Sequence, residues 1–379
     1  MKKFVLVVFS IFFSLLIAEG VSRIIFDPID YLKPRRVPDN ILGFKLLPNT
    51  GAHDSWGYRN KSVPSTADIV TIGDSNTYGI SATASKTWPS ILGQLTGKVV
   101  YNLSLSNYGP VEYFYLFKNK AFKLNPSLVI VGFYLGNDLK NAYNTTYKND
   151  YWRELRMPGF IHKEKINEGE VVKDSPFDHI ANWFPSHSVL YRIISRPFFG
   201  DEVRQLRRLL RHEEIIIFKN KEHNIKAGFM PSARLQAFNL GDPIIQEGLR
   251  ISLELISKMN DMSKEKNIDF LVLLIPTKET VFSEFIEHNS ELPRYDVIDK
   301  VISNERQANL LVKGYFSERG IAFIDLEDVL RNAVNSEQVY PNNFGDHLNK
   351  NGYSIVAKTI KRYLNRNSKG SSNSNQIEH

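Results

Sequence analysis

The hydrophobic pattern of the chain begins with an uninterrupted apolar run. FVLVVFSIFFSLLIA at 4–18 follows Lys2 and Lys3, and the apolar character continues to Phe26. Two cations before such a run are typical of an export signal, and a helix over 4–26 would span about 35 Å, enough to cross a bilayer core. No small-x-small cleavage site follows the run, so the pattern favours an uncleaved membrane anchor over a removed signal. The two lysines would keep the N-terminus in the cytoplasm, which places the rest of the chain outside it, in the periplasm or the extracellular space.

Short apolar runs alternate with helical patterns from residue 67 onward. Strands are expected at 67–72, 98–104, 127–135, 268–276 and 321–326, and helices at 88–95, 111–123, 244–266, 299–319 and 349–364. Strands that are apolar throughout and separated by helices are typical of a parallel sheet covered on both faces. The sequence therefore predicts an α/β fold, a three-layer αβα sandwich.

Two stretches do not fit this alternation. Residues 27–66 are rich in proline, asparagine and charge, which predicts a lead-in linker with little regular structure. Residues 145–242 are too long for a simple connection and carry many aromatic and charged residues, so we expect an insertion with its own small structure, such as a lid or a polymer-binding flap. Its basic stretch RQLRRLLRHEE at 204–214 is typical of an exposed helix, or could bind acidic sugars or lipid headgroups. The full division is a signal-anchor helix (1–26), the linker (27–66), a first part of the sheet domain (67–144), the insertion (145–242), a second part (243–366) and a disordered polar tail (367–379).

Composition narrows the classes of function. The 48 Lys and Arg residues exceed the 41 Asp and Glu residues by a net charge of +7, but the excess is spread along the chain. No basic block is interleaved with aromatics, so nucleic-acid binding is not expected. The chain has no cysteine, which excludes disulfides, thiolate zinc sites and a cysteine nucleophile. The nine histidines have no metal-ligand spacing, and we expect neither a metal nor a cofactor.

Four polar blocks follow or flank the predicted elements. Ser75 stands directly after the first strand, where a parallel sheet gathers its ligands and catalytic groups. A Gly-Asp-Ser triplet alone would be interpreted as a turn that caps a helix. Three further polar blocks favour a catalytic role for Ser75 instead, because two of them follow predicted strands and one precedes the last predicted helix. The four are GDSNTYG (73–79), NLSLSNYG (102–109), LGND (135–138) and GDHLN (345–349).

Taken in order, these blocks resemble those of the SGNH/GDSL hydrolase superfamily, over about 67–140 and 244–365. The hydrophobic start followed by Gly57-Tyr58-Arg59 is similar to membrane-anchored bacterial members. The resemblance implies the SGNH hydrolase fold, with a flavodoxin-like sheet. It also implies the removal or transfer of acyl groups, often acetyl, on cell-envelope carbohydrates.

The resemblance assigns a role to each block. Ser75 would be the nucleophile that forms an acyl-enzyme, and His347 its general base. The predicted place of His347 at a helix start would help to keep the imidazole neutral. The oxyanion would be held by the backbone N–H groups of Ser75 and Asn107 and by the side-chain amide of Asn137.

The chain departs from the family pattern at two positions. Asn107 stands where the second block normally has a glycine, although asparagine tolerates unusual backbone angles. Phe344 stands where the family carries the acid that orients the histidine. Asp346 is a candidate for that role and equally for a structural turn, Asn343 or a backbone carbonyl is another, and a Ser-His dyad is a further possibility.

Three hypotheses follow. The leading one is a serine esterase that removes acyl groups, with acetyl favoured, from an envelope or secreted polysaccharide. The second is an O-acyltransferase, in which a sugar hydroxyl intercepts the same acyl-enzyme. The third is a catalytically inactive sugar-binding module. The expected partners are an acylated carbohydrate and, through the N-terminal helix, the membrane.

Overall fold

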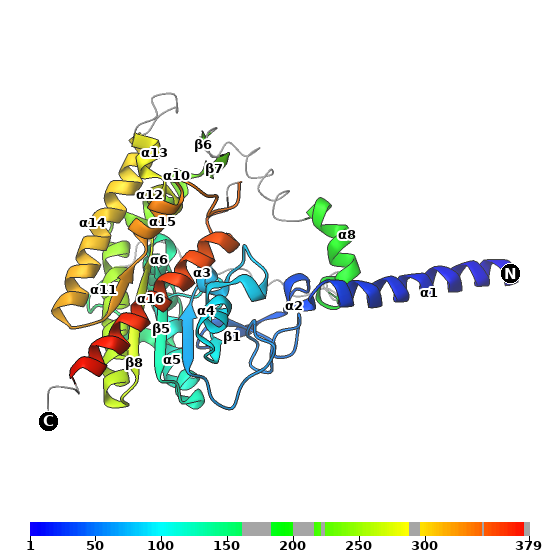
Figure 1. The fold of residues 1–379 in the computed structure, drawn as a ribbon, viewed down its shortest axis with the longest axis horizontal. Coiled ribbons are helices and arrows are strands. Elements are labelled where there is room, and N and C mark those ends of the chain that lie inside the picture. Colours follow the sequence, from blue (N-terminus) through cyan, green and yellow to red (C-terminus); the bar gives the residue numbers. More distant parts are fainter. Residues whose placement is uncertain (161–182, 200–215, 221–223, 288–295, 343–344, 375–379) are drawn as a thin grey trace. The chain divides into compact units, whose positions relative to one another are not determined.

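The computed structural model of the 379-residue chain describes residues 1–160, 183–199, 216–220, 224–287, 296–342 and 345–374. The chain divides into two compact units (Figure 1). The first unit is Met1–Asp39, Gly43–Val63 and Ile161–His212, and the second is Asn40–Leu42, Pro64–Phe160 and Glu213–His379. The second unit contains all four polar blocks.

The second unit is built on a five-stranded parallel sheet. Its strand order is β4-β3-β5-β8-β9, which in sequence order is the flavodoxin-like arrangement 2-1-3-4-5. This confirms the predicted parallel sheet. The two edge strands, at 100–102 and 323–325, are shorter than expected. The strands are β3 (Ile69–Gly73), β4 (Val100–Asn102), β5 (Leu128–Tyr134), β8 (Asp269–Ile275) and β9 (Phe323–Asp325).

One face of the sheet is covered by α5 (Pro110–Asn119), α6 (Leu135–Lys148) and α11 (Pro243–Glu265). Side chains from these three helices form one apolar cluster. Phe117 of α5 meets Phe270 of β8 edge-on, with ring centroids 6.1 Å apart. The cluster joins three helices that are far apart in sequence into one layer.

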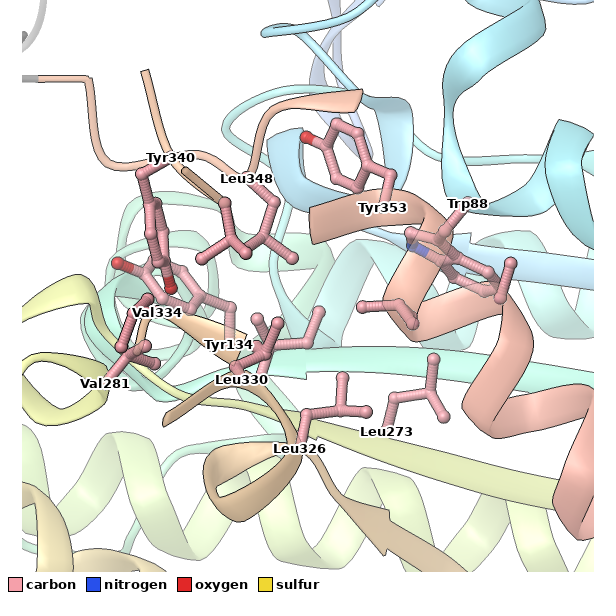
Figure 2. Packing of buried hydrophobic residues seen from close by; sticks show 14 of the residues in the cluster. Trp88, Tyr134, Leu273, Val281, Leu326, Leu330, Val334, Tyr340, Leu348 and Tyr353 are labelled. Atoms are coloured by element: carbon pink, nitrogen blue, oxygen red, sulfur yellow. The ribbon is translucent and has the colours of Figure 1, made fainter. Parts of the chain in front are cut away.

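The other face packs against α4 (Trp88–Thr96), α15 (Glu327–Ala333) and α16 (Lys350–Ser374) (Figure 2). Leu271, Leu273 and Ile275 of β8 belong to this cluster, whereas the alternate residue Phe270 contacts α5. Successive strand residues point to opposite faces, so a strand that is apolar at every position requires a helix layer on both sides. The predicted three-layer sandwich is therefore present.

Regular structure occurs in the segment that was expected to be a linker. It contains the short helix α2 (Pro28–Tyr31) and an antiparallel hairpin of β1 (Arg36–Asp39) and β2 (Gly43–Leu46). Arg59 and Asp30 form a largely buried ion pair at 2.8 Å, which joins the beginning and the end of this segment. At the other end of the chain, α16 continues to Ser374, past the expected end at 364 and into the predicted tail.

The expected insertion contributes to both units. Its last part forms the hairpin β6 (Ile216–Asn220) and β7 (Ile225–Phe229), whose buried aromatics Phe218 and Phe229 join the core beside Phe282. The helix α8 (Val189–Phe199) belongs to the first unit. The basic stretch 204–214 lies outside the described residues. The remaining short elements are α3 (Ser75–Tyr78), η1 (Ala84–Lys86), η2 (Ala121–Leu124), η3 (Asp150–Leu155), α10 (Pro231–Leu235), η4 (Gln236–Phe238), α12 (Lys278–Val281) and α13 (Ser283–Glu287), with the long α14 (Asp296–Glu318) before β9.

The first helix, α1 (Lys2–Ile25), is the one described helix that is long and apolar enough to cross a membrane. Its most apolar window has a mean hydropathy of 2.5, and no part of that window is buried. A removable signal sequence near an N-terminus has the same length and composition, so these two properties alone do not distinguish an anchor from a signal.

Candidate active site

The serine turn begins where β3 ends. Asp74 caps α3, because its Oδ1 accepts the backbone N–H of Asn76 at 2.8 Å, and Ser75 is the first residue of that helix. A Cβ at Gly73 would lie 2.3 Å from Thr77 Oγ1, and a Cβ at Gly132 on the adjacent strand would lie 2.2 Å from the same atom. The two glycines therefore let the first turn of α3 sit directly on the sheet. Gly132 was not singled out from the sequence, where a glycine within an apolar strand was its only signal.

Ser75 and His347 are in hydrogen-bonding contact. The distance from Ser75 Oγ to His347 Nε2 is 2.7 Å, although the residues are 272 positions apart. Hydrogen bonds on both sides of His347 hold its loop. The carbonyl of Gly345 accepts a hydrogen bond from Lys278 Nζ at 2.9 Å, and Asn349 Oδ1 accepts from the N–H of Gly352 at 3.1 Å, which caps the start of α16.

The contact lies at a particular point of the sheet. The strand order reverses between β3 and β5, since the chain moves to β4 on one side of β3 before it returns to β5 on the other. Ser75 follows β3 and Asn137 follows β5, both at the carboxyl edge. In open α/β sheets, ligands bind at this reversal because the two connections diverge there and leave room between them.

Asn137 lies close to the serine turn. Its Nδ2 is 3.3 Å from Asp74 Oδ2, the oxygen that also lies 3.2 Å from Ser75 Oγ. A primary amide carries two N–H bonds, so one contact with Asp74 leaves the second for another acceptor. The start of α6 is fixed by Asp138, which accepts from the Tyr134 N–H and the Tyr113 hydroxyl, each at 2.9 Å. With these two contacts Asp138 shapes the turn between β5 and α6.

Asn107 lies in a tight turn beside the same strand end. The N–H of Tyr108 donates to the carbonyl of Leu105 at 3.2 Å, and Asn107 has φ 69°, in the left-handed region. Glycine and asparagine are the residues that adopt this region most easily, which explains why asparagine is tolerated here. The N–H of Leu105 donates to the carbonyl of Gly73 at 3.2 Å, so the turn is tied to the serine turn. The side chain of Asn107 is exposed.

Asp346 is paired with a residue that the sequence did not single out. Its Oδ2 accepts from Arg234 Nη2, and Arg234 Nη1 donates to the carbonyl of Gly136 at 3.1 Å. Among the described residues, neither Asp346 nor any other side chain hydrogen-bonds Nδ1 of His347. The structure therefore joins Asp346 to the site through Arg234 and not through the imidazole. Asn343, the other residue considered for the orienting role, and Phe344, at the position of the family's acid, lie outside the described residues.

Burial and nearby charge set the protonation of these groups. Burial lowers the pKa of His347, Arg234 and Lys278 lower it further, and the carboxylates of Asp74 and Asp346 oppose them. Burial raises the pKa of Asp74 despite the nearby imidazole. For Asp346 burial acts in the same upward direction, but Arg234, Lys278 and His347 outweigh it and the net pKa is lowered. Burial is thus the main reason that the imidazole stays neutral. The sequence had suggested a different cause, the position of His347 at the start of a helix.

Arg234 carries no sequence signal of its own, and the only signal for Lys278 is its position after the predicted strand 268–276, which favours a strand-end turn over a contact with substrate. Arg234 lies on the short helix α10, within the segment that was expected to be an insertion, and Lys278 follows β8 at the carboxyl edge of the sheet. Lys278 is fully buried. No group of three or more acidic, histidine or cysteine side chains that could hold a metal occurs among the described residues.

Comparison with known proteins gives similarity at the level of structure only. No family model matches the chain, and no curated protein matches it. Among solved structures, it is similar to a putative lipolytic protein of the G-D-S-L family from Desulfitobacterium hafniense, at 14% identity and a TM-score of 0.37 over 78% of this chain and 97% of that one. A catalytic mutant of an acetylxylan esterase from Geobacillus stearothermophilus matches at 12% identity and a TM-score of 0.37, over 79% and 94%. An extracellular lipase from Streptomyces rimosus matches at 12% identity and a TM-score of 0.41, over 78% and 99%. Similarities this distant do not assign an activity, so the function depends on the geometry of the chain's own site.

Proposed function

We propose that this protein is a serine esterase of the SGNH/GDSL type. The single observation that carries the proposal is the 2.7 Å contact between Ser75 Oγ and His347 Nε2. A hydroxyl in contact with a neutral imidazole, at the carboxyl edge of a parallel sheet, is the arrangement that nucleophilic acyl transfer requires. The low pKa of His347, caused first by burial, supports its role as a base.

The direction of proton transfer follows from the geometry. The Ser75 hydroxyl has one proton and two neighbours, His347 Nε2 at 2.7 Å and Asp74 Oδ2 at 3.2 Å. Donation to the nearer nitrogen requires the tautomer of His347 that is protonated at Nδ1. Ser75 Oγ would then attack the ester carbonyl while Nε2 takes its proton. A bond forms from Oγ to the carbonyl carbon, and the carbonyl oxygen becomes an oxyanion.

The remaining steps use the same groups in reverse. The N–H groups of Ser75 and Asn107 and the second amide N–H of Asn137 would donate to the oxyanion. Collapse breaks the bond to the alcohol, which leaves with the proton from His347 and produces the acyl-enzyme. Water then attacks the acyl carbon, His347 takes its proton, and the acid is released as Ser75 recovers its hydrogen.

The substrate class is part of the proposal. We infer an acylated, most simply acetylated, polysaccharide of the envelope or secreted material, because the four polar blocks and Gly57-Tyr58-Arg59 resemble envelope-acting members of the superfamily. The apolar helix α1, in which no part of the most apolar window is buried, supports a membrane-anchored enzyme whose catalytic unit is outside the cytoplasm.

The proposal is tested with full-length protein in detergent. Purified protein is incubated with an acetyl ester, with and without an acceptor sugar, and both acetate and acetylated sugar are measured. The expected result is acetate release without the acceptor, and its loss in Ser75→Ala. Acetylated sugar with no acetate release would overturn the esterase in favour of a transferase. Neither product, from a folded protein that binds polysaccharide, would overturn the enzyme altogether.

A further inference from the structure

Glu19 is an acidic residue within the apolar helix α1, and its carboxylate is occupied by another helix of the same unit. Oε1 accepts the backbone N–H of Val189 at 3.0 Å, and Oε2 accepts the N–H of Leu190 at 2.9 Å and the hydroxyl of Ser188 at 2.8 Å. These N–H groups belong to the first turn of α8, which has no acceptors of its own for them. Glu19 therefore caps α8 and holds its start against α1.

The position of Glu19 along α1 fixes where α8 begins. From Lys3 to Glu19 the helix rises about 24 Å, compared with a hydrocarbon core of about 30 Å. With Lys2 and Lys3 at the cytoplasmic headgroups, Arg23, about 30 Å along the helix from Lys3, would lie at the opposite headgroup level. Glu19, which is paired with Arg23 at 2.7 Å, would lie about one helical turn deeper, just below that level. The start of α8 would therefore lie at the outer surface of the bilayer.

Large apolar side chains are exposed around the start of α8. Trp183 and Phe184 are 52% and 46% exposed, and Tyr191 and Ile194 are 37% and 58% exposed. The rings of Phe184 and Tyr191 have centroids 5.6 Å apart, and those of Trp183 and Phe184 are 5.2 Å apart, so the three aromatic side chains form one surface. Ile194 lies three residues after Tyr191 on α8, which places it on the same helix face. Val189, by contrast, is fully buried. Trp and Tyr are enriched where a protein meets the headgroup layer, because their rings are apolar and their N–H or O–H is polar.

We propose that Trp183, Phe184, Tyr191 and Ile194 form an interfacial patch that lies in the outer leaflet beside α1. The occupant is the lipid surface, because the patch is joined through Glu19 to a helix whose most apolar window is wholly exposed and long enough to span a membrane. The inference rests on the proposed membrane anchoring. It also predicts that α1 is retained, because its removal would leave Val189 and Leu190 without the acceptor that caps α8.

The absence of cysteine in the chain allows single spin labels. Full-length variants Ile194→Cys, Phe12→Cys and Leu310→Cys are labelled in nanodiscs of phosphatidylcholine, and the accessibility of each label to oxygen is compared with that to a water-soluble nickel chelate. Phe12 reports on α1. Leu310 is a matched apolar control that is 66% exposed on α14. The expected oxygen-to-nickel ratio is highest for Phe12, intermediate for Ile194 and lowest for Leu310.

Two results would overturn the inference, and they differ in meaning. If the Phe12 label is lipid-exposed while the Ile194 label matches that at Leu310, α1 spans the bilayer but the patch lies in water. If the Phe12 label is itself water-exposed, the anchor is absent and the patch has no bilayer beside it. Ester hydrolysis measured on the same nanodiscs reports separately on the catalytic proposal, so failure of one is not confused with failure of the other.

Discussion

Arg234 is ion-paired with Asp346, the residue that directly precedes the proposed base His347. The same guanidinium donates to the carbonyl of Gly136, next to Asn137. Arg234 thus connects the loop that carries the proposed base with the loop that carries Asn137, the proposed oxyanion donor. A planar guanidinium can bridge two acceptors in this way because its N–H groups have a fixed geometry.

Replacement of Arg234 is expected to impair catalysis in two ways. In Arg234→Met the two loops lose their bridge, and kcat/KM is expected to fall about 10- to 100-fold, the effect of a small misplacement of reacting groups. The carboxylate of Asp346 also loses its partner, which raises the pKa of His347. The acidic limb of the pH–rate profile should therefore move to higher pH.

Two further variants separate positioning from general destabilisation. Arg234→Lys keeps the positive charge, so the acidic limb should return to its wild-type pH. The rate should recover only in part, because lysine cannot bridge the two acceptors as a guanidinium does. Arg250→Met removes an arginine that pairs with Glu247 at 2.7 Å on α11, and it should leave the limb in place. An unchanged limb in Arg234→Met would contradict the electrostatic role of Arg234.

The pH dependence of the wild-type enzyme follows from the environment of His347. Burial lowers the pKa of this imidazole below its ordinary value of about 6.5, and the base is active only when neutral. The value of kcat/KM should therefore be constant near neutral pH and fall as the pH drops through a midpoint below about 6.5. Circular dichroism over the same range checks that the fold persists. A midpoint above that value, in a folded protein, would contradict the burial argument.

Asn137 is expected to act on the transition state. In Asn137→Ala, kcat should fall about 10²- to 10³-fold with little change in KM, because an oxyanion donor is lost. Asn119→Ala is a matched control, since Asn119 Nδ2 donates to the Tyr115 carbonyl at 2.9 Å at the end of α5. Steady-state kinetics with a soluble acetyl ester measures both variants. A loss confined to KM would instead indicate substrate binding.

Asn107 is expected to contribute its backbone and not its side chain. Glycine adopts a φ of 69° without steric strain, so Asn107→Gly should retain the oxyanion donor and the activity. Asn107→Val should lose about 1–2 kcal/mol of folding free energy or move the turn, because a β-branched residue is strained in this region. Thermal melting and kcat on both variants give the comparison. Loss of activity in Asn107→Gly would show that the amide side chain is required.

The sequence was sufficient to predict the sheet and the edge of the sheet at which Ser75 and Asn137 lie. The strand Leu128–Tyr134 has no polar side chain apart from the tyrosine hydroxyl, which is typical of a doubly covered parallel sheet, and the carboxyl ends of such strands share one edge. The proximity of Ser75 and Asn137 follows from that rule. The position of His347 before the last helix came from the resemblance of the blocks, and the structure brings it to Ser75.

Other features depend on packing between distant segments, which leaves no periodic signal. Arg234 lies in a polar stretch without a motif, and only the fold brings it to Asp346. Gly132 matters because Thr77 packs on it from another element. The hairpin of Arg36–Asp39 and Gly43–Leu46 was missed because each strand has only four residues and the first contains a proline, which is typical of a linker.

Labelling with a serine-directed fluorophosphonate tests the central claim most directly. Full-length protein is treated with the probe, and the modified residue is located by peptide mass spectrometry in the wild type, His347→Ala and Ser75→Ala. The account predicts modification of Ser75 in the wild type, strongly slowed labelling in His347→Ala and none at this position in Ser75→Ala. A folded wild-type protein in which Ser75 stays unmodified, or is modified equally fast without His347, would contradict it.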